Sequence, residues 1–299
     1  MPPAEPDPAV PSPGPGVDPW QGLLDDAATF PPGNADLGDA LAAYDARRNE
    51  WYADLVGSFV LRDTDLGSAP AEVPVSVVLT TGAGGIDGVA GLAARKGLTL
   101  AGLEVALRDV HDLAGNARRV VAAVDQARAA GTLDESVPVY VELPQTDATH
   151  GWLSAADEVA AAELRIKLRT GGVDAAMFPT APVLASWIDA ALDRETPFKC
   201  TAGLHHAVRH TASKDFDVPV DQHGFLNVLL ATEALFDGAG TDEAVALLEL
   251  RATDALVARV RRTDVPRTRR WFTSHGSCSV TDPLDDLIAL GLLEGPTDD

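Results

Sequence analysis

Two lysines lie in segments whose residue types suit covalent chemistry. Lys167 belongs to the alternating segment Leu164–Thr170, and Lys199 follows Phe198 and precedes a turn that contains Gly203. Among 23 basic residues the chain has only four lysines, at positions 96, 167, 199 and 214. An ammonium group can lose its proton and become a nucleophile, whereas a guanidinium group stays charged. Lys167 and Lys199 are therefore the predicted catalytic lysines.

Polar and apolar residues alternate in four short segments, which predicts strands with one charged face. The apolar face of a helix-covered parallel strand packs against helices, so the other face points into the sheet interior or a barrel. The predicted interior set is Glu104, Arg108, Glu142, Lys167, Arg169 and Lys199. Unpaired buried charges cost several kcal/mol each, so this set forms either ion pairs or a site. Four cations against two glutamates predict an electropositive site, in which repulsion lowers the pKa of one lysine.

A glycine turn follows the strand that carries Lys167 and Arg169. In Thr170-Gly171-Gly172, free backbone N–H groups at the end of a strand can receive a phosphate or a carboxylate. The same dipeptide is also common in tight turns without a ligand. We expect this turn, with Arg169, to bind an anionic group of the substrate. A second glycine-rich turn at residues 82–85 does not complete a dinucleotide-binding motif.

Four of the seven histidines lie between residues 205 and 223. His205 and His206 are predicted to move protons in catalysis, and the nearby Thr201 is predicted to contact substrate. A metal site built from these histidines and Glu142 is the alternative, although the H-E-x-x-H arrangement is absent. We expect His210 to be structural.

The segment from Trp271 to Ser279 predicts a last strand that runs into a loop of small residues. Loops after the final strands of a barrel often bind phosphate, so His275 and Ser277 are predicted substrate-binding residues. Cys278 could be a nucleophile, but a lone cysteine is more often a small buried apolar residue. The two cysteines lack a C-x-x-C spacing, and neither a disulfide, a metal nor a cofactor is expected.

Strand and helix patterns alternate along most of the chain, which predicts a parallel sheet. The predicted strands are Phe59–Arg62, Val73–Thr81, Leu103–Asp109, Val137–Leu143, Leu164–Thr170, Ala175–Phe178, Phe198–Leu204 and Arg270–His275. Helices are predicted within residues 36–57 and near 87–96, 115–130, 154–162, 182–193, 225–236, 242–262 and 283–290. Eight strands close a barrel, so we predict a (β/α)8 TIM-type barrel with an N-terminal helix. Residues 205–268 show no clear strand pattern, so an irregular or incomplete barrel is the alternative.

Composition limits the classes of partner and the compartment. The chain of 299 residues carries a formal net charge of −22, which repels nucleic acids and anionic membranes. An apolar run of about 18 residues or more is absent, so we expect neither a membrane span nor a signal peptide, and a cytoplasmic location. Eight prolines in residues 1–20 predict a disordered tail, which leaves 21–299 as a single domain. The sequence leaves open whether the chain forms a homo-oligomer.

Four segments resemble an uncharacterised bacterial barrel family, and the likeness spans most of the chain. They are Ile166–Gly172 (IKLRTGG), Phe198–His206 (FKCTAGLHH), His223–Asn227 (HGFLN) and Gly276–Ser279 (GSCS). The two lysines with their Thr-Gly and Ala-Gly turns are also similar to class I aldolases of the deoxyribose-phosphate type. That resemblance implies an imine on Lys167 with Lys199 as its activating neighbour. Glu142 or Glu104 would stand in for the catalytic aspartate of those aldolases.

Three functions are compatible with these residues. The first is an aldolase-like lyase that acts on a small anionic carbonyl metabolite through a lysine imine, with Glu142 and a histidine moving protons. The second is a metal-dependent hydrolase or lyase that uses His205, His206 and Glu142. The third is a barrel that binds a charged metabolite without catalysis.

Overall fold

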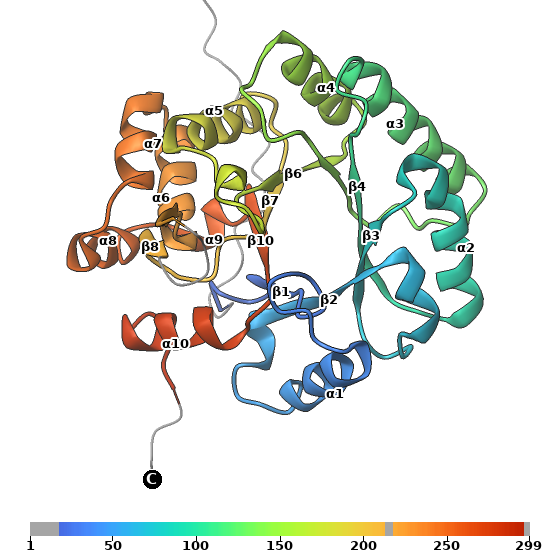
Figure 1. Cartoon of the computed structure of the whole chain (residues 1–299), viewed down its shortest axis with the longest axis horizontal. Coiled ribbons are helices and arrows are strands. Elements are labelled where there is room, and N and C mark those ends of the chain that lie inside the picture. The colour runs from blue at the N-terminus through green and yellow to red at the C-terminus, as the bar shows by residue number, and fades with distance from the viewer. Residues whose placement is uncertain (1–17, 213–217, 296–299) are drawn as a thin grey trace, which may run out of the picture.

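Eight parallel strands close into a barrel in the computed structural model, which describes residues 18–212 and 218–295. Around the barrel the strands follow the order β1-β10-β7-β6-β5-β4-β3-β2 (Figure 1). Their bounds are β1 Leu24–Asp26, β2 Val56–Arg62, β3 Val75–Leu79, β4 Leu100–Ala106, β5 Val139–Glu142, β6 Arg165–Arg169, β7 Phe198–Thr201 and β10 Phe272–Ser277. The predicted TIM-type barrel is confirmed, and it is closed.

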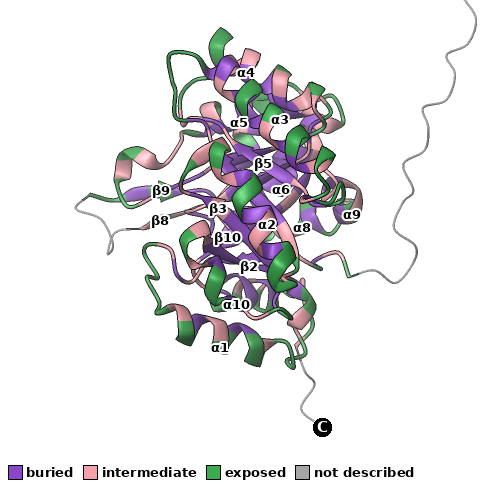
Figure 2. Ribbon diagram, turned by 90° about the vertical axis from the view of Figure 1, so that its right-hand side faces the viewer, coloured by how far each residue is buried: buried purple, intermediate pink, exposed green. Residues whose placement is uncertain are grey.

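Helices surround the barrel, and exposed residues concentrate on their outer faces (Figure 2). The α-helices are α1 Leu37–Arg47, α2 Ile86–Lys96, α3 Leu113–Ala129, α4 His150–Ala161, α5 Ala181–Leu192, α6 Phe225–Phe236, α7 Thr241–Leu248, α8 Thr253–Val260, α9 Val265–Thr268 and α10 Thr281–Ala289. Short 3-10 helices are η1 Ala53–Leu55, η2 Asp63–Ser68, η3 Gly82–Gly85 and η4 Ala175–Met177. The predicted N-terminal helix corresponds to α1.

Register places the charged residues of neighbouring strands at one level of the barrel. Glu142 of β5 pairs with Lys167 of β6, and Lys167 pairs with Lys199 of β7. Leu103 and Val105 on β4 join the hydrophobic core between barrel and helices, and Glu104 between them points the other way. Alternation along each strand therefore brings the glutamates and lysines into the interior.

The segment Ala175–Leu192 has the length and apolarity of a membrane span, with a mean hydropathy of 1.3. It contains α5, which contacts α6 and α7. Trp187 of α5 stacks on Trp152 of α4 with ring centroids 6.5 Å apart, and both rings are buried. In this structure the apolar residues of α5 thus belong to the core of the barrel domain.

Several predicted elements differ from the observed ones. The first strand, β1, was not predicted because Leu24-Asp25-Asp26 has no β-branched residue and resembles a loop. Residues 175–178, predicted as a strand, contain η4 Ala175–Met177 instead. The single helix predicted over 242–262 is two helices, α7 and α8. Within residues 205–268, where no strand was predicted, an antiparallel hairpin is formed by β8 His210–Ala212 and β9 Val220–Gln222.

The predicted tail falls mainly on residues 1–17, which lie outside the described residues. Trp20, at its end, is only 3% exposed, and its indole N–H donates to the carbonyl of Leu292 at 2.8 Å. The packed part of the chain thus begins before residue 21. The single-domain assignment stays a prediction.

Candidate functional site

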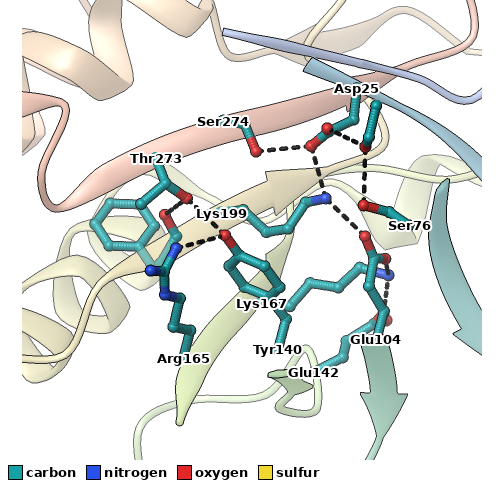
Figure 3. Close-up of polar contacts among 12 residues, drawn as sticks. Asp25, Ser76, Glu104, Tyr140, Glu142, Arg165, Lys167, Lys199, Thr273 and Ser274 are labelled. Carbon is teal, nitrogen blue, oxygen red and sulfur yellow. Dashed lines mark hydrogen bonds and ion pairs between the residues drawn. The ribbon is translucent and has the colours of Figure 1, made fainter. Parts of the chain in front are cut away.

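A continuous chain of ion pairs crosses the barrel interior (Figure 3). Lys167 Nζ lies 2.6 Å from Glu104 Oε2 and 2.9 Å from Glu142 Oε2. Glu142 Oε1 in turn accepts a hydrogen bond from Arg169 Nε at 2.7 Å. The side chains of Lys167 and Glu104 are only 3% and 2% exposed, so this part of the chain is almost fully removed from water.

The same chain continues through Lys199 to Asp25, a residue that the sequence patterns did not reveal. Lys199 Nζ donates to Glu104 Oε1 at 2.6 Å and to Asp25 Oδ2 at 2.7 Å. Asp25 also accepts hydrogen bonds from Ser274 at 2.7 Å and from Ser58 at 2.6 Å. The surplus of predicted interior cations was the one signal that another carboxylate had to be present.

The charges of the interior are balanced, which corrects two predictions. Lys167, Lys199 and Arg169 face Glu104, Glu142 and Asp25, so the lattice is not electropositive. Arg108 was predicted among these residues, but it is exposed, because β4 ends at Ala106 and alternation no longer governs the following residues. Its assignment to the site is wrong.

Neighbouring charges decide the protonation of these groups. Burial by itself would raise the pKa of Glu104, but Lys167 and Lys199 lower it to about 2. Burial would likewise lower the pKa of Lys167 and of Lys199, but the two carboxylates beside each ammonium raise it. The predicted lowering of one lysine pKa by ammonium repulsion is therefore wrong in this state.

A second polar cluster closes the interior below Lys199. The Tyr140 hydroxyl accepts a hydrogen bond from Arg165 Nη1 at 3.0 Å and lies 3.2 Å from Thr273 Oγ1. Lys199 Nζ lies 5.2 Å from the centre of the Tyr140 ring, within range of a cation–π interaction. Tyr140 therefore separates the ion pairs from the opposite end of the barrel.

A cavity opens above the ion pairs and has two compartments. The inner compartment, of about 230 Å³, is lined by the charged residues Glu104, Lys167, Arg169 and Lys199. The outer compartment, of about 480 Å³, is lined by His206, His210 and Gln222 among others. The two compartments share the lining residues Pro31, Gly172, Val173, Ala202, His205 and Cys278. A molecule with its reacting atom near Lys167 can therefore extend outward.

The loops after β6 and β7 approach each other at the cavity wall. A Cβ on Gly203, whose φ is +74°, would lie 2.9 Å from the Cα of Gly171, so glycine is required here. The Thr170 hydroxyl donates to the Ala202 carbonyl at 2.5 Å. Gly172 and Thr201 line the inner compartment as predicted. Thr170 and Gly171 join the two loops and are not among its lining residues, which corrects their assignment to substrate binding.

The predicted histidines are divided between the compartments. His205 lines both and lies 3.8 Å, by Nδ1, from Cys278 Sγ. His206 lines the outer compartment, and its Nδ1 lies 3.2 Å from Asp286 Oδ2. The described residues contain no group of three His, Cys, Asp or Glu side chains that could hold a metal ion. Cys278 lines both compartments and is only partly buried, which differs from the buried residue that was expected.

Two predicted substrate-binding residues of β10 do not reach the cavity. His275 is fully buried and stacks on Phe225 of α6 with ring centroids 5.1 Å apart. Burial lowers the pKa of His275 to about 3, so the ring is neutral in this apolar setting. The Ser277 hydroxyl donates to the carbonyl of Ser279 at 2.6 Å and holds the turn. Both assignments are wrong. Side chains alternate along β10, so His275 and Ser277 lie on the face opposite to Gly276, which lines the inner compartment.

Comparisons with known proteins show a shared fold. No protein-family model matches the chain, and neither does any curated protein. A deoxyribose phosphate aldolase from Aeropyrum pernix, described as a unique tetramer, is similar in structure with a TM-score of 0.52 and 13% identity, covering 92% of this chain and 94% of that one. An aldolase called QR15 gives a TM-score of 0.51 and 12% identity, covering 91% and 97%. The chain thus has the barrel fold of these aldolases.

Proposed function

We propose that this protein is an aldolase-like lyase that forms an imine between Lys167 and a small anionic carbonyl compound. The observation that carries the proposal is a lysine at the base of a cavity, within 2.9 Å of two carboxylates. Amines attack carbonyl carbons only when unprotonated, so the lysine needs a proton acceptor in contact with it. The two structurally similar aldolases support the same class of chemistry.

Glu142 is the proposed acceptor of the Lys167 proton. Its side chain is 14% exposed, against 2% for Glu104, and Glu104 is also held by both lysines. Proton transfer to Glu142 gives a neutral amine, which attacks the carbonyl carbon. The oxygen of the resulting carbinolamine takes one proton from the nitrogen and one from the protonated Glu142 and leaves as water, which gives a protonated imine and restores the Glu142 carboxylate. Each proton is thereby accounted for within this pair and the substrate.

Cleavage follows from the imine if the substrate carries a hydroxyl on its β-carbon. A base removes the hydroxyl proton, the Cα–Cβ bond breaks to release an aldehyde, and the bonding electrons move into the protonated imine to give an enamine. His205 lines both compartments and is the proposed base. Protonation of the enamine carbon and hydrolysis by one water release the second carbonyl product and restore Lys167.

Lys199 has a different proposed role, as a permanent positive charge. It lies between Asp25 and Glu104, and its side chain is 2% exposed. Carboxylates raise the pKa of both lysines, but neither partner of Lys199 is as exposed to the cavity as Glu142, the partner proposed to take the proton of Lys167. In this position Lys199 keeps Glu104 ionised and stabilises negative charge near Lys167, without forming a covalent bond.

An anionic group of the substrate is proposed to bind near Arg169 and Gly172. The Arg169 side chain is 30% exposed and lines the inner compartment while Glu142 holds its Nε. A guanidinium engaged on one edge still presents donors on another, which suits a carboxylate. The metal-dependent alternative has no supporting cluster among the described residues.

Borohydride trapping with pyruvate tests the proposal. Reduction of an imine leaves a stable covalent adduct, which intact-mass measurement detects. Lys167→Arg should abolish the adduct because guanidinium supplies no amine, while Lys199→Arg should retain it. Trapping that persists in Lys167→Arg would refute the assignment, and so would its absence from the unmodified protein.

A further inference from the structure

The outer compartment holds a buried polar side chain that no described residue satisfies. Gln222 of β9 is 6% exposed and is one of the residues that line this compartment. The carboxamide makes no hydrogen bond to any residue in 18–212 or 218–295, although the neighbouring Asp221 is bonded to Thr211 at 2.6 Å. An amide that faces a cavity without a protein partner can bond to a ligand that both accepts and donates hydrogen bonds.

The charges around Gln222 select against a phosphate. Asp282 also lines the outer compartment, and the carboxylate of Asp286, outside the lining, lies 3.2 Å from His206 Nδ1. Burial and the neighbouring His206 lower the pKa of His210, so this histidine adds little positive charge. Within the described part of the chain, neither lysine nor arginine lines this compartment. A dianion would meet the Asp282 carboxylate here, whereas hydroxyls can bond to amide, imidazole and carboxylate alike.

The inner compartment limits the anion to a single charge. Its cations are already matched by Glu104, Glu142 and Asp25, so only one edge of Arg169 is left for substrate. Arg169 lies two residues beyond Lys167 on β6, so its guanidinium and the reacting nitrogen belong to the same compartment. A carboxylate close to the carbonyl carbon meets both conditions.

We infer that the substrate is a 2-oxo acid whose uncharged, hydroxylated chain binds in the outer compartment and hydrogen-bonds to Gln222. This inference rests on the proposed imine at Lys167. It adds that the far end of the substrate carries hydroxyls in place of a phosphate ester. The volume of the outer compartment, about 480 Å³, is about twice that of the inner one and accommodates such a chain.

Three carbonyl compounds separate the inference from the proposed function. Pyruvate reaches only the inner compartment, 2-keto-3-deoxygluconate adds a hydroxylated chain, and 2-keto-3-deoxy-6-phosphogluconate adds the same chain with a terminal phosphate. The concentration that gives half-maximal borohydride trapping is measured for each. We expect the hydroxylated acid to trap at concentrations at least about tenfold below those of the other two, the effect of one or two hydrogen bonds.

Variants of the outer compartment locate the effect. Gln222→Leu should raise the half-maximal concentration of the hydroxylated acid about tenfold and leave that of pyruvate unchanged. Gln126→Leu, on the exposed face of α3, is the matched control and should change neither. Asp282→Asn removes a carboxylate and should improve trapping of the phosphorylated acid, which keeps the inference testable if Gln222→Leu does not fold.

The outcomes are distinct. Preference for the phosphorylated acid, or an unchanged response in a folded Gln222→Leu, would overturn this inference while pyruvate trapping upheld the imine. Failure of all three compounds to trap would overturn the proposed function together with the inference.

Discussion

Glu104 holds two ammonium groups at once, and this makes it the residue on which the interior depends. Each of its carboxylate oxygens lies 2.6 Å from a different lysine nitrogen. The free-energy cost of removing these charged groups from water is offset only while every oppositely charged partner is present. The site is therefore a set of mutually dependent charges, in which a single substitution leaves its neighbours buried and incompletely paired.

Glu104→Gln should lower the free energy of unfolding by about 3 kcal/mol, because Lys167 and Lys199 each lose one buried carboxylate. Urea denaturation measures the change. Glu158→Gln is the control, since Glu158 forms an exposed ion pair with Arg118 at 2.7 Å, and such pairs contribute about 0–1 kcal/mol. Equal, small effects of both substitutions would show that the interior ion pairs add nothing to stability.

The pH dependence of this contribution has a defined sign. The pKa of Glu104 falls from an ordinary value of 4.5 to about 2 on folding, so its stabilisation is present above 4.5 and is lost as the pH falls toward 2. The lysine pKa values rise on folding, so their contribution is present below 10.5 and is lost at higher pH. The stability difference between the unmodified protein and Glu104→Gln should thus shrink between pH 5 and pH 2. A constant difference across that range would contradict the assignment.

The residues of the interior site could be predicted from the sequence only where polar and apolar residues alternate clearly. Glu104, Glu142, Lys167 and Lys199 lie on strands with an unbroken alternating pattern, and they meet in the interior. Asp25 could not be found because its strand is three residues long. Arg108 and His275 were misplaced because alternation fails past the end of β4 and within β10, whose register shifts between Phe272 and His275.

At the scale of elements, the closed barrel depends on β1 and β10, which pair with each other and bring Asp25 beside Ser274. The loops after β6 and β7 then shape the cavity above the lysines, and their contact at Gly171 and Gly203 leaves no room for a side chain. Hydrophobic periodicity predicted β6 and β7, but it carries no information about such backbone contacts. The loop geometry therefore required the structure.

Gly203→Ala should destabilise the protein by about 2 kcal/mol and reduce imine trapping, because a Cβ would strain the positive φ and push the two loops apart. Gly88→Ala in α2 offers a matched control. Its Cβ would meet no atom within 4 Å, and alanine in a helix should stabilise by up to about 1 kcal/mol. Thermal unfolding and trapping are measured on both variants, and normal behaviour of Gly203→Ala would refute the predicted loop contact.

At the scale of the whole molecule, a strongly acidic chain surrounds a cavity whose charges are balanced. The net charge of −22 repels an approaching anion over distances that salt can screen, while the partly buried Arg169 is screened much less. A homo-oligomer, a cytoplasmic location and the absence of nucleic-acid or membrane partners stay predictions.

Added salt should therefore speed imine trapping at low pyruvate concentration. Raising NaCl from about 0.01 M to about 0.15 M shortens the Debye length from about 30 Å to about 8 Å and weakens the long-range repulsion. Acetaldehyde is the neutral control and should trap at a rate that salt does not change. A fall in the pyruvate rate with salt would instead indicate an electropositive entrance.

The covalent attachment site is the most direct test of the central claim. The protein is reduced with borohydride in the presence of pyruvate, digested, and mapped by mass spectrometry. We predict one adduct, on the peptide that contains Lys167, and an unmodified Lys199. An adduct on Lys199, or activity that survives arginine at both positions and is lost with a chelator, would contradict the proposed imine at Lys167, and the second result would favour the metal-dependent alternative.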